Sequence, residues 1–148
     1  MSDEIIAAEA EAVPAWYWAA AVCALLFELI GCYFYLAEVR LTPEQVATLP
    51  LDQAQMLAAR PSWYYAAFGV AVWVGLVGAV GLLLRKAWSD RMLGASLVAV
   101  IVQFSAIIIV PEMRLVSSDA LLGQVMIIIT CYGIFMLARL AKRRGWLR

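Results

Sequence analysis

Four long apolar stretches constrain this chain more than any other feature of its sequence. They cover approximately residues 15–37, 63–84, 92–110 and 120–138. Each stretch approaches or reaches the ~20 residues that an α-helix needs to cross ~30 Å of hydrocarbon. Hydrophobic residues make up 66% of the chain, and the mean hydropathy of +0.88 agrees with membrane insertion. The sequence therefore predicts an all-α integral membrane protein whose first partner is the lipid bilayer.

The connections between these stretches predict an up-down-up-down four-helix bundle that forms one domain over residues 1–148. The connection from Pro111 to Ser118 is short, and short connections place consecutive helices antiparallel. The connection between the first two stretches is the longest part of the chain outside the apolar stretches. We expect it to contain short amphipathic helices over one end of the bundle. A lid over a bound solute and a plain interfacial connection are both compatible with this segment, and the plain connection is favoured.

Local signals place these short helices more closely. Thr42 and Gln45 have the spacing of a capping box, and Pro43 occupies the position of a first helical residue. Pro50 interrupts the segment, and Asp52 is a candidate cap for a second helix. The sequence therefore predicts one helix after Thr42 and another after Asp52.

The basic residues are distributed unevenly, although the formal net charge is +0. The segment 1–13 is acidic and contains no Lys or Arg, whereas the tail 139–148 is strongly basic. An even number of spans puts both termini on one side, where the chain has eight basic residues against three on the other side. The positive-inside rule therefore predicts that both termini are cytoplasmic, as in a multi-pass protein of the bacterial inner membrane.

The residue types argue against an enzyme. The chain contains no histidine, so it supplies neither imidazole ligands for haem, copper or zinc nor a histidine base. Cys23, Cys32 and Cys131 all fall within apolar stretches and form no C-x-x-C pair, so we expect small buried hydrophobic residues. We predict no catalytic residue, no cofactor and no metal site, and nothing in the charge pattern suggests nucleic-acid binding.

Glu28 is the exception among the apolar residues, because it lies near the middle of the first stretch. Placing an ionised acidic group at that depth costs at least ~3 kcal/mol. We therefore expect Glu28 to face the interior of the bundle and to be protonated at neutral pH, since apolar surroundings disfavour a charged carboxyl group. Gln103 has a comparable depth in the third stretch, and Thr130 lies near the midpoint of the fourth. Glu28, Gln103 and Thr130 are candidates for one intramembrane polar cluster.

Two roles for this cluster remain open. In the structural role, protonated Glu28 donates a hydrogen bond to Gln103 and fixes the register of the helices. In the functional role, Glu28 exchanges protons with a cavity and couples them to the movement of a cationic or neutral solute. The residues favour the structural role, because the sequence places no second carboxylate at a similar depth.

Small residues recur at intervals of three or four along the second stretch. Residues at this spacing share one helix face, and in lipid they allow close approach of helix backbones. This candidate packing stripe consists of Ala67, Ala71, Gly75, Gly78 and Gly81. It could serve packing within one chain or a subunit interface, and packing within the chain is favoured.

Several motifs resemble a group of small four-span bacterial membrane proteins that have no settled function and are sometimes labelled transporters. These motifs are E-L-I-G from Glu28, T-P-E-Q-V-A-T-L-P from Thr42, R-P-S-W from Arg60, V-G-L-V-G-A-V-G-L-L-L-R-K-A-W from Val74, and R-G-W-L from Arg144. The resemblance implies a four-span helical fold without naming a substrate.

A narrower likeness concerns the small multidrug resistance family of dimeric, proton-coupled exporters. Phe27–Gly31 is similar to the glutamate motif in the first helix of that family, and Ala71–Gly75 is similar to its Trp-x-Gly motif. In this chain the second motif falls on the second span rather than the third, and the first outer connection is longer. The likeness implies that Glu28 would be the working carboxylate of an exporter.

Together these features favour a non-enzymatic accessory or structural component of the membrane. We expect it to self-associate as a homo-oligomer or to join a larger membrane complex. The alternative is a small-solute or proton-coupled transporter that uses Glu28.

Overall fold

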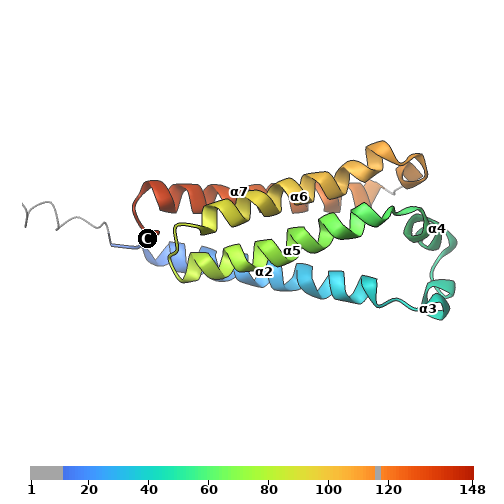
Figure 1. Cartoon of the computed structure of the whole chain (residues 1–148), viewed down its shortest axis with the longest axis horizontal. Coiled ribbons are helices and arrows are strands. Elements are labelled where there is room, and N and C mark those ends of the chain that lie inside the picture. The colour runs from blue at the N-terminus through green and yellow to red at the C-terminus, as the bar shows by residue number, and fades with distance from the viewer. Residues whose placement is uncertain (1–11, 116–117) are drawn as a thin grey trace, which may run out of the picture.

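The chain folds as a bundle of four long helices, each antiparallel to the next along the chain (Figure 1). The computed structural model describes residues 12–115 and 118–148. The long helices are α2 (Ala15–Val39), α5 (Ser62–Leu83), α6 (Ser89–Ile109) and α7 (Ser118–Arg143). All four are long and apolar enough to cross a bilayer. The predicted all-α, up-down-up-down four-helix bundle is therefore confirmed.

Two of the helix boundaries differ from those predicted. The α6 helix begins at Ser89 rather than near residue 92, and α7 continues to Arg143 rather than ending near 138. Hydropathy set the predicted limits, and the additional turns contain charged residues, among them Asp90 and Lys142, that a hydropathy criterion excludes. Of the predicted acidic segment 1–13, residues 1–11 lie outside the part of the chain that the structure describes.

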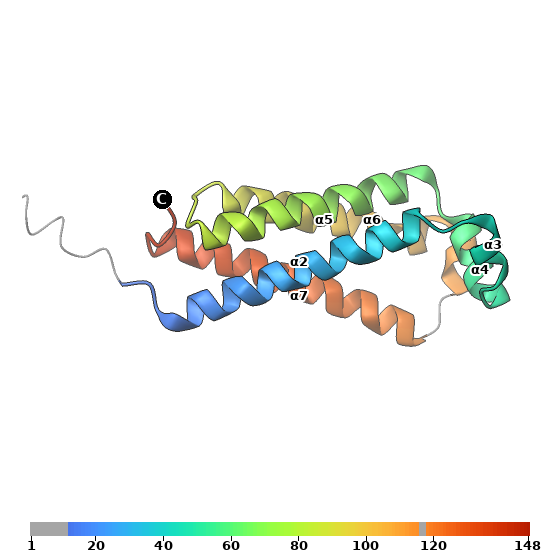
Figure 2. The ribbon, with the colours of Figure 1, turned by 90° about the horizontal axis from the view of Figure 1, so that it is seen from below.

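The core is tightest at the end of the bundle that carries the termini. Residues of all four long helices meet there, including Tyr17, Ala21, Leu82, Leu93 and Ala138. Ala21 and Ala138 are completely buried, and such small side chains let helix backbones approach closely. Toward the opposite end, α2 and α7 diverge from each other (Figure 2).

The small-residue stripe of α5 contacts other helices of the same chain. Ala67 is half-buried, and the other four members of the stripe are buried. A Cβ at Gly78 would lie 2.7 Å from Cγ of Leu93 in α6, and one at Gly81 would lie 2.8 Å from Cζ3 of Trp88. A Cβ at Gly75 would instead lie 2.6 Å from Cδ of Glu28 in α2. These glycines therefore bring both α2 and α6 close to α5.

The long connection forms two short helices, α3 (Pro43–Ala47) and α4 (Leu51–Ala59), at the end of the bundle opposite the chain termini, which is called the outer end below (Figure 1). The predicted capping box is present, since the Gln45 backbone N–H donates to Thr42 Oγ1 (3.3 Å) and the Thr42 backbone N–H donates to Gln45 Oε1 (3.0 Å). The prediction that Asp52 caps the second helix is wrong. Pro50 occupies the N-cap position, and Asp52 is the second helical residue, where its charge still favours the helix N-terminus.

A short 3₁₀ helix, η1 (Pro111–Leu115), follows α6 and lies beside α4. Met113 of this segment is buried against Tyr64 and Ala106. The outer end of the α5–α6 pair is therefore covered by η1 and α4, whereas α2 and α7 separate at the same level.

Candidate functional site

A cavity of about 390 Å³ lies between the four long helices, in the half of the bundle nearer α3 and α4. Most of its walls are apolar, and aromatic rings are prominent among them: Phe27, Phe34, Phe68 and Phe104. The polar side chains that line it are Glu28, Glu38, Tyr64, Ser96, Gln103 and Gln124. Such a composition, an apolar enclosure with a few convergent polar groups, is typical of a small-molecule binding site.

Glu28 lies at the inner end of this cavity and is only 5% exposed. Its carboxyl group occupies the space beside α5 that Gly75 leaves by having no side chain. Among the described residues, no side chain or backbone group forms a hydrogen bond or an ion pair with this carboxyl group. Since burying an unpaired polar group costs free energy, the carboxyl group is poised to accept a partner that enters the cavity.

The outer part of the cavity is bordered by two connected polar pairs. Gln103 Nε2 donates a hydrogen bond of 3.1 Å to the Tyr64 hydroxyl group. The guanidinium group of Arg60 lies 4.7 Å from the centroid of the Tyr64 ring and forms an ion pair with Glu38. Glu38 is therefore neutralised by its neighbour, which leaves Glu28 as the cavity's carboxylate without a counter-charge among the described residues.

The predicted polar cluster does not form as expected. Glu28 and Gln103 line the same cavity, but Gln103 donates to Tyr64 rather than accepting from Glu28. Thr130 is absent from the residues that line the cavity, and its hydroxyl group donates to the Met126 carbonyl oxygen (2.8 Å). A threonine in a helix commonly satisfies its hydroxyl group one turn back in this way, without a tertiary partner.

Four polar residues at this cavity were not predicted from the sequence as site residues, namely Glu38, Tyr64, Ser96 and Gln124. Gln124 carried a usable signal, because an amide in a predicted span tends to face the protein interior. The position of Tyr64 was misleading, since a tyrosine near the end of a span ordinarily lies at the membrane–water interface.

The expectation for the cysteines holds in part. Cys32 and Cys131 are buried, and Cys131 lines the cavity, whereas Cys23 is exposed on the bundle surface. In lipid an exposed cysteine meets hydrocarbon rather than water, so hydropathy alone could not distinguish the two environments.

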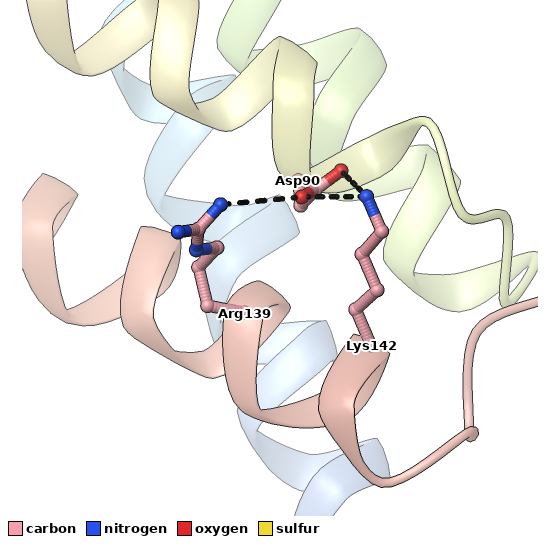
Figure 3. Close-up of polar contacts among 3 residues, drawn as sticks. All are labelled: Asp90, Arg139 and Lys142. Carbon is pink, nitrogen blue, oxygen red and sulfur yellow. Dashed lines mark hydrogen bonds and ion pairs between the residues drawn. The ribbon is translucent and has the colours of Figure 1, made fainter.

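Polar contacts join the helices at the end of the bundle that carries the chain termini (Figure 3). Asp90 at the start of α6 is 3% exposed, and Lys142 Nζ of α7 lies 2.9 and 3.0 Å from its carboxylate oxygens. Arg139 also approaches Asp90, at 3.9 Å. On the other side of the bundle, the Tyr17 hydroxyl group donates to the Leu82 carbonyl oxygen (2.7 Å). Hydrogen bonds and ion pairs therefore link α2 to α5 and α6 to α7 at this end.

The predicted basic tail also takes part in this closure. Gly145 adopts a left-handed conformation (φ 70°), in which glycine avoids the strain of a side chain, and the chain turns back there. Trp146 is then buried with its ring 5.7 Å from that of Tyr17. Arg85 Nε donates to the Trp146 carbonyl oxygen (2.8 Å), and the Arg148 backbone N–H donates to the Arg85 carbonyl oxygen (2.6 Å). The tail thus packs against the α5–α6 turn and the start of α2.

The cavity thus combines aromatic walls with a few polar groups. Gln103, Glu38 and Ser96 have partners within the protein, whereas the Glu28 carboxyl group has none among the described residues. No family model, no curated protein and no solved structure matches the chain.

Proposed function

We propose that this chain is a carrier of the bacterial inner membrane that binds a small solute in the cavity between its four long helices. The buried Glu28 carboxyl group at the inner end of that cavity, with no partner among the described residues, carries the proposal. A ligand that pairs with it supplies the interaction that the protein lacks. The aromatic walls of the cavity, and a lining that contains no Lys or Arg among the described residues, favour a solute with an apolar body and a neutral or positively charged polar group.

Proton coupling follows from competition at one group. A proton and the positively charged group of a solute both neutralise the Glu28 carboxylate, so the binding of either opposes the binding of the other. Such competition is a coupling free energy between two ligands, and it is reciprocal. A solute could therefore be exchanged for a proton across the membrane without any further titratable group.

This function is tested by measuring the binding of three probes that share one alkyl chain and differ in their polar group. Octylammonium, octan-1-ol and octanoate are titrated into the protein in lipid nanodiscs, and binding is measured by calorimetry against empty nanodiscs. At a pH high enough to ionise Glu28, we expect the amine and the alcohol to bind, and octanoate to bind about tenfold more weakly or not at all, because the two carboxylates repel each other. Glu28→Gln should weaken octylammonium binding about tenfold while leaving octan-1-ol nearly unchanged.

Glu44→Gln is the matched control, because Glu44 is an exposed glutamate of α3 that does not line the cavity. Thermal unfolding of both variants should match that of the unmodified protein. Equal octylammonium affinity in Glu28→Gln, or octanoate binding as strong as that of the amine, would show that Glu28 does not receive the solute.

Both termini are proposed to be cytoplasmic, as the distribution of basic residues favours. A reporter that is active only outside the cytoplasm should give a signal when fused after Gln53, in the connection that contains α4. The same reporter should stay inactive when fused after Asp90 or Arg148. A signal from the fusion at Arg148 would contradict this orientation.

Self-association is the second candidate function, with the chain as an accessory component of a larger membrane complex. The specific observation in its favour is that residues 118–130, the outer half of α7, are all exposed or half-buried. Gly123 and Gly133 of this helix are exposed, and a Cβ at either would meet nothing within 4 Å. Exposed glycines in a membrane helix leave room for the close approach of another helix.

A further inference from the structure

The residues that line the cavity divide sharply by exposure. Those on α5 and α6 are buried or half-buried, and the side chains of Tyr64, Val72, Val100 and Gln103 are at most 6% exposed. The exposed lining residues all belong to α2 and α7: Ile30, Phe34, Ala120, Gly123 and Ile127. The cavity therefore has a complete wall on the side of α5 and α6 and an opening between α2 and α7.

The position of the opening determines the medium that it faces. The first and last helices both contribute to the core cluster nearer the chain termini, with residues such as Ala24 and Ile134, and they diverge toward the other end (Figure 2). Both helices are long and apolar enough to span a bilayer. Around the opening, Ile30 is 56% exposed and Phe34 is 59% exposed. Exposed apolar side chains on a membrane span contact lipid chains, so the opening faces hydrocarbon rather than water.

We propose that the solute enters this cavity sideways from the bilayer, through the opening between α2 and α7, and that the solute is a single-chain amphiphile. This inference rests on the proposed function and specifies both the route and the class of ligand. The chain of the amphiphile lies along the opening, against Ile30, Phe34 and Ile127, and its polar group reaches Glu28. An anionic polar group is disfavoured, because the described lining residues include no Lys or Arg and an ionised Glu28 repels it, so the polar group is neutral or positively charged.

The geometry of the opening explains why a chain-bearing ligand fits better than a compact one. The apolar lining continues without a polar barrier from the interior residue Phe27 to the exposed residues of α2 and α7. In contrast, the route toward the outer surface is bordered by the Glu38–Arg60 ion pair and by α4, which lies over the α5–α6 end. Passage through hydrocarbon therefore requires no ion pair to break.

Two glycines of α7 offer a matched pair of variants. Both Gly123 and Gly133 are exposed and have open space at the Cβ position, so a large side chain is accommodated at either without a clash in the bundle. Gly123 lines the cavity, and Gly133 does not. Gly123→Trp should therefore fill the opening, whereas Gly133→Trp adds the same side chain to the same helix away from it.

Photolabelling of buried positions reports entry. Hexadecylamine with a diazirine in the middle of its chain is dissolved in vesicles that contain the protein, the sample is illuminated, and adducts are mapped by mass spectrometry. Because Val100 and Gln103 are buried, adducts on them require the probe to enter the cavity. We expect such adducts in the unmodified protein, a loss of about tenfold in Gly123→Trp, and no loss in Gly133→Trp. A probe with the same alkyl chain and diazirine, but with a carboxylate in place of the amine, should give few adducts on these buried residues.

The outcomes separate the route from the proposed function. Interior adducts that persist in Gly123→Trp, or that fall equally in both variants, would overturn entry between α2 and α7. If interior adducts are absent while octylammonium still binds, the bilayer route is wrong and the binding site stands. If octylammonium also fails to bind, the proposed function itself is wrong. Finally, a detergent-solubilised mass of two copies that Gly123→Trp reduces to one would show that a second chain covers the opening instead.

Discussion

Gly75→Val should strongly destabilise the bundle, because the Glu28 carboxyl group already occupies the space that the new side chain needs. A Cβ at position 75 would lie 2.6 Å from Cδ and 2.8 Å from Oε1 of Glu28. Overpacking of this kind costs about 1–3 kcal/mol, and displacing a buried carboxyl group within a membrane adds to that cost. We expect a clearly lower midpoint of thermal unfolding by circular dichroism in mild detergent.

Two further variants make this result specific. Gly133→Val is the control for helix propensity, because its Cβ meets nothing within 4 Å, and it should be nearly neutral. Combining Gly75→Val with Glu28→Ala removes the clash, so the double variant should be more stable than the sum of the single effects predicts. Coupling energies between contacting residues are about 0.5–3 kcal/mol. Additive effects would mean that Glu28 does not pack on Gly75.

Removing both cations beside Asp90 should have the second large effect. In Lys142→Met combined with Arg139→Met, the buried Asp90 carboxylate loses the partners shown in Figure 3. Stranding a fully buried charge costs about 3–5 kcal/mol, and we expect a smaller loss of ~1–2 kcal/mol because both cations are partly exposed. The measurement is again the midpoint of thermal unfolding.

A further substitution at Asp90 tests whether the loss of stability comes from charge rather than from packing. Adding Asp90→Asn to the double variant should restore much of the stability, since a neutral amide has no counter-charge to lose. Arg143→Met is the control, because Arg143 is an exposed cation in the last turn of α7 that makes no contact with Asp90. A failure of Asp90→Asn to restore stability would show that Lys142 and Arg139 act through their aliphatic stems.

Local features of the sequence predicted the fold well. Hydropathy and length identified the four long helices, and the Thr42–Gln45 spacing identified the start of α3. Hydropathy could not show which face of each helix points inward, because lipid and protein interior are equally apolar. Glu28 was an exception, since an acidic side chain at that depth must avoid lipid and is therefore expected to point toward the interior of the bundle.

The candidate site was less predictable, because its contacts join residues far apart in the chain. Gln103 has Tyr64 as its partner, and Trp146 packs on Tyr17 near the opposite end of the sequence. No local pattern distinguishes these partners from other polar or aromatic residues at similar depth. The size of the cavity likewise follows from the divergence of α2 and α7, which depends on how α2 packs on α5 and how α7 packs on α6.

The buried residues of α7 all lie in its C-terminal half, so a small tilt of the helix there moves its other end by a larger distance. It contains 26 residues and is therefore roughly 39 Å long at ~1.5 Å per residue. Its buried residues, Cys131, Ile134, Ala138 and Ala141, all lie in the half nearer the tail, where Trp146 and the Asp90 pair hold it. A tilt of about 10° around the middle of these buried residues would displace the far end by about 5 Å, because about 18 residues lie between the two points. The width of the opening therefore depends on the tilt of α7 as well as on the side chains that line it.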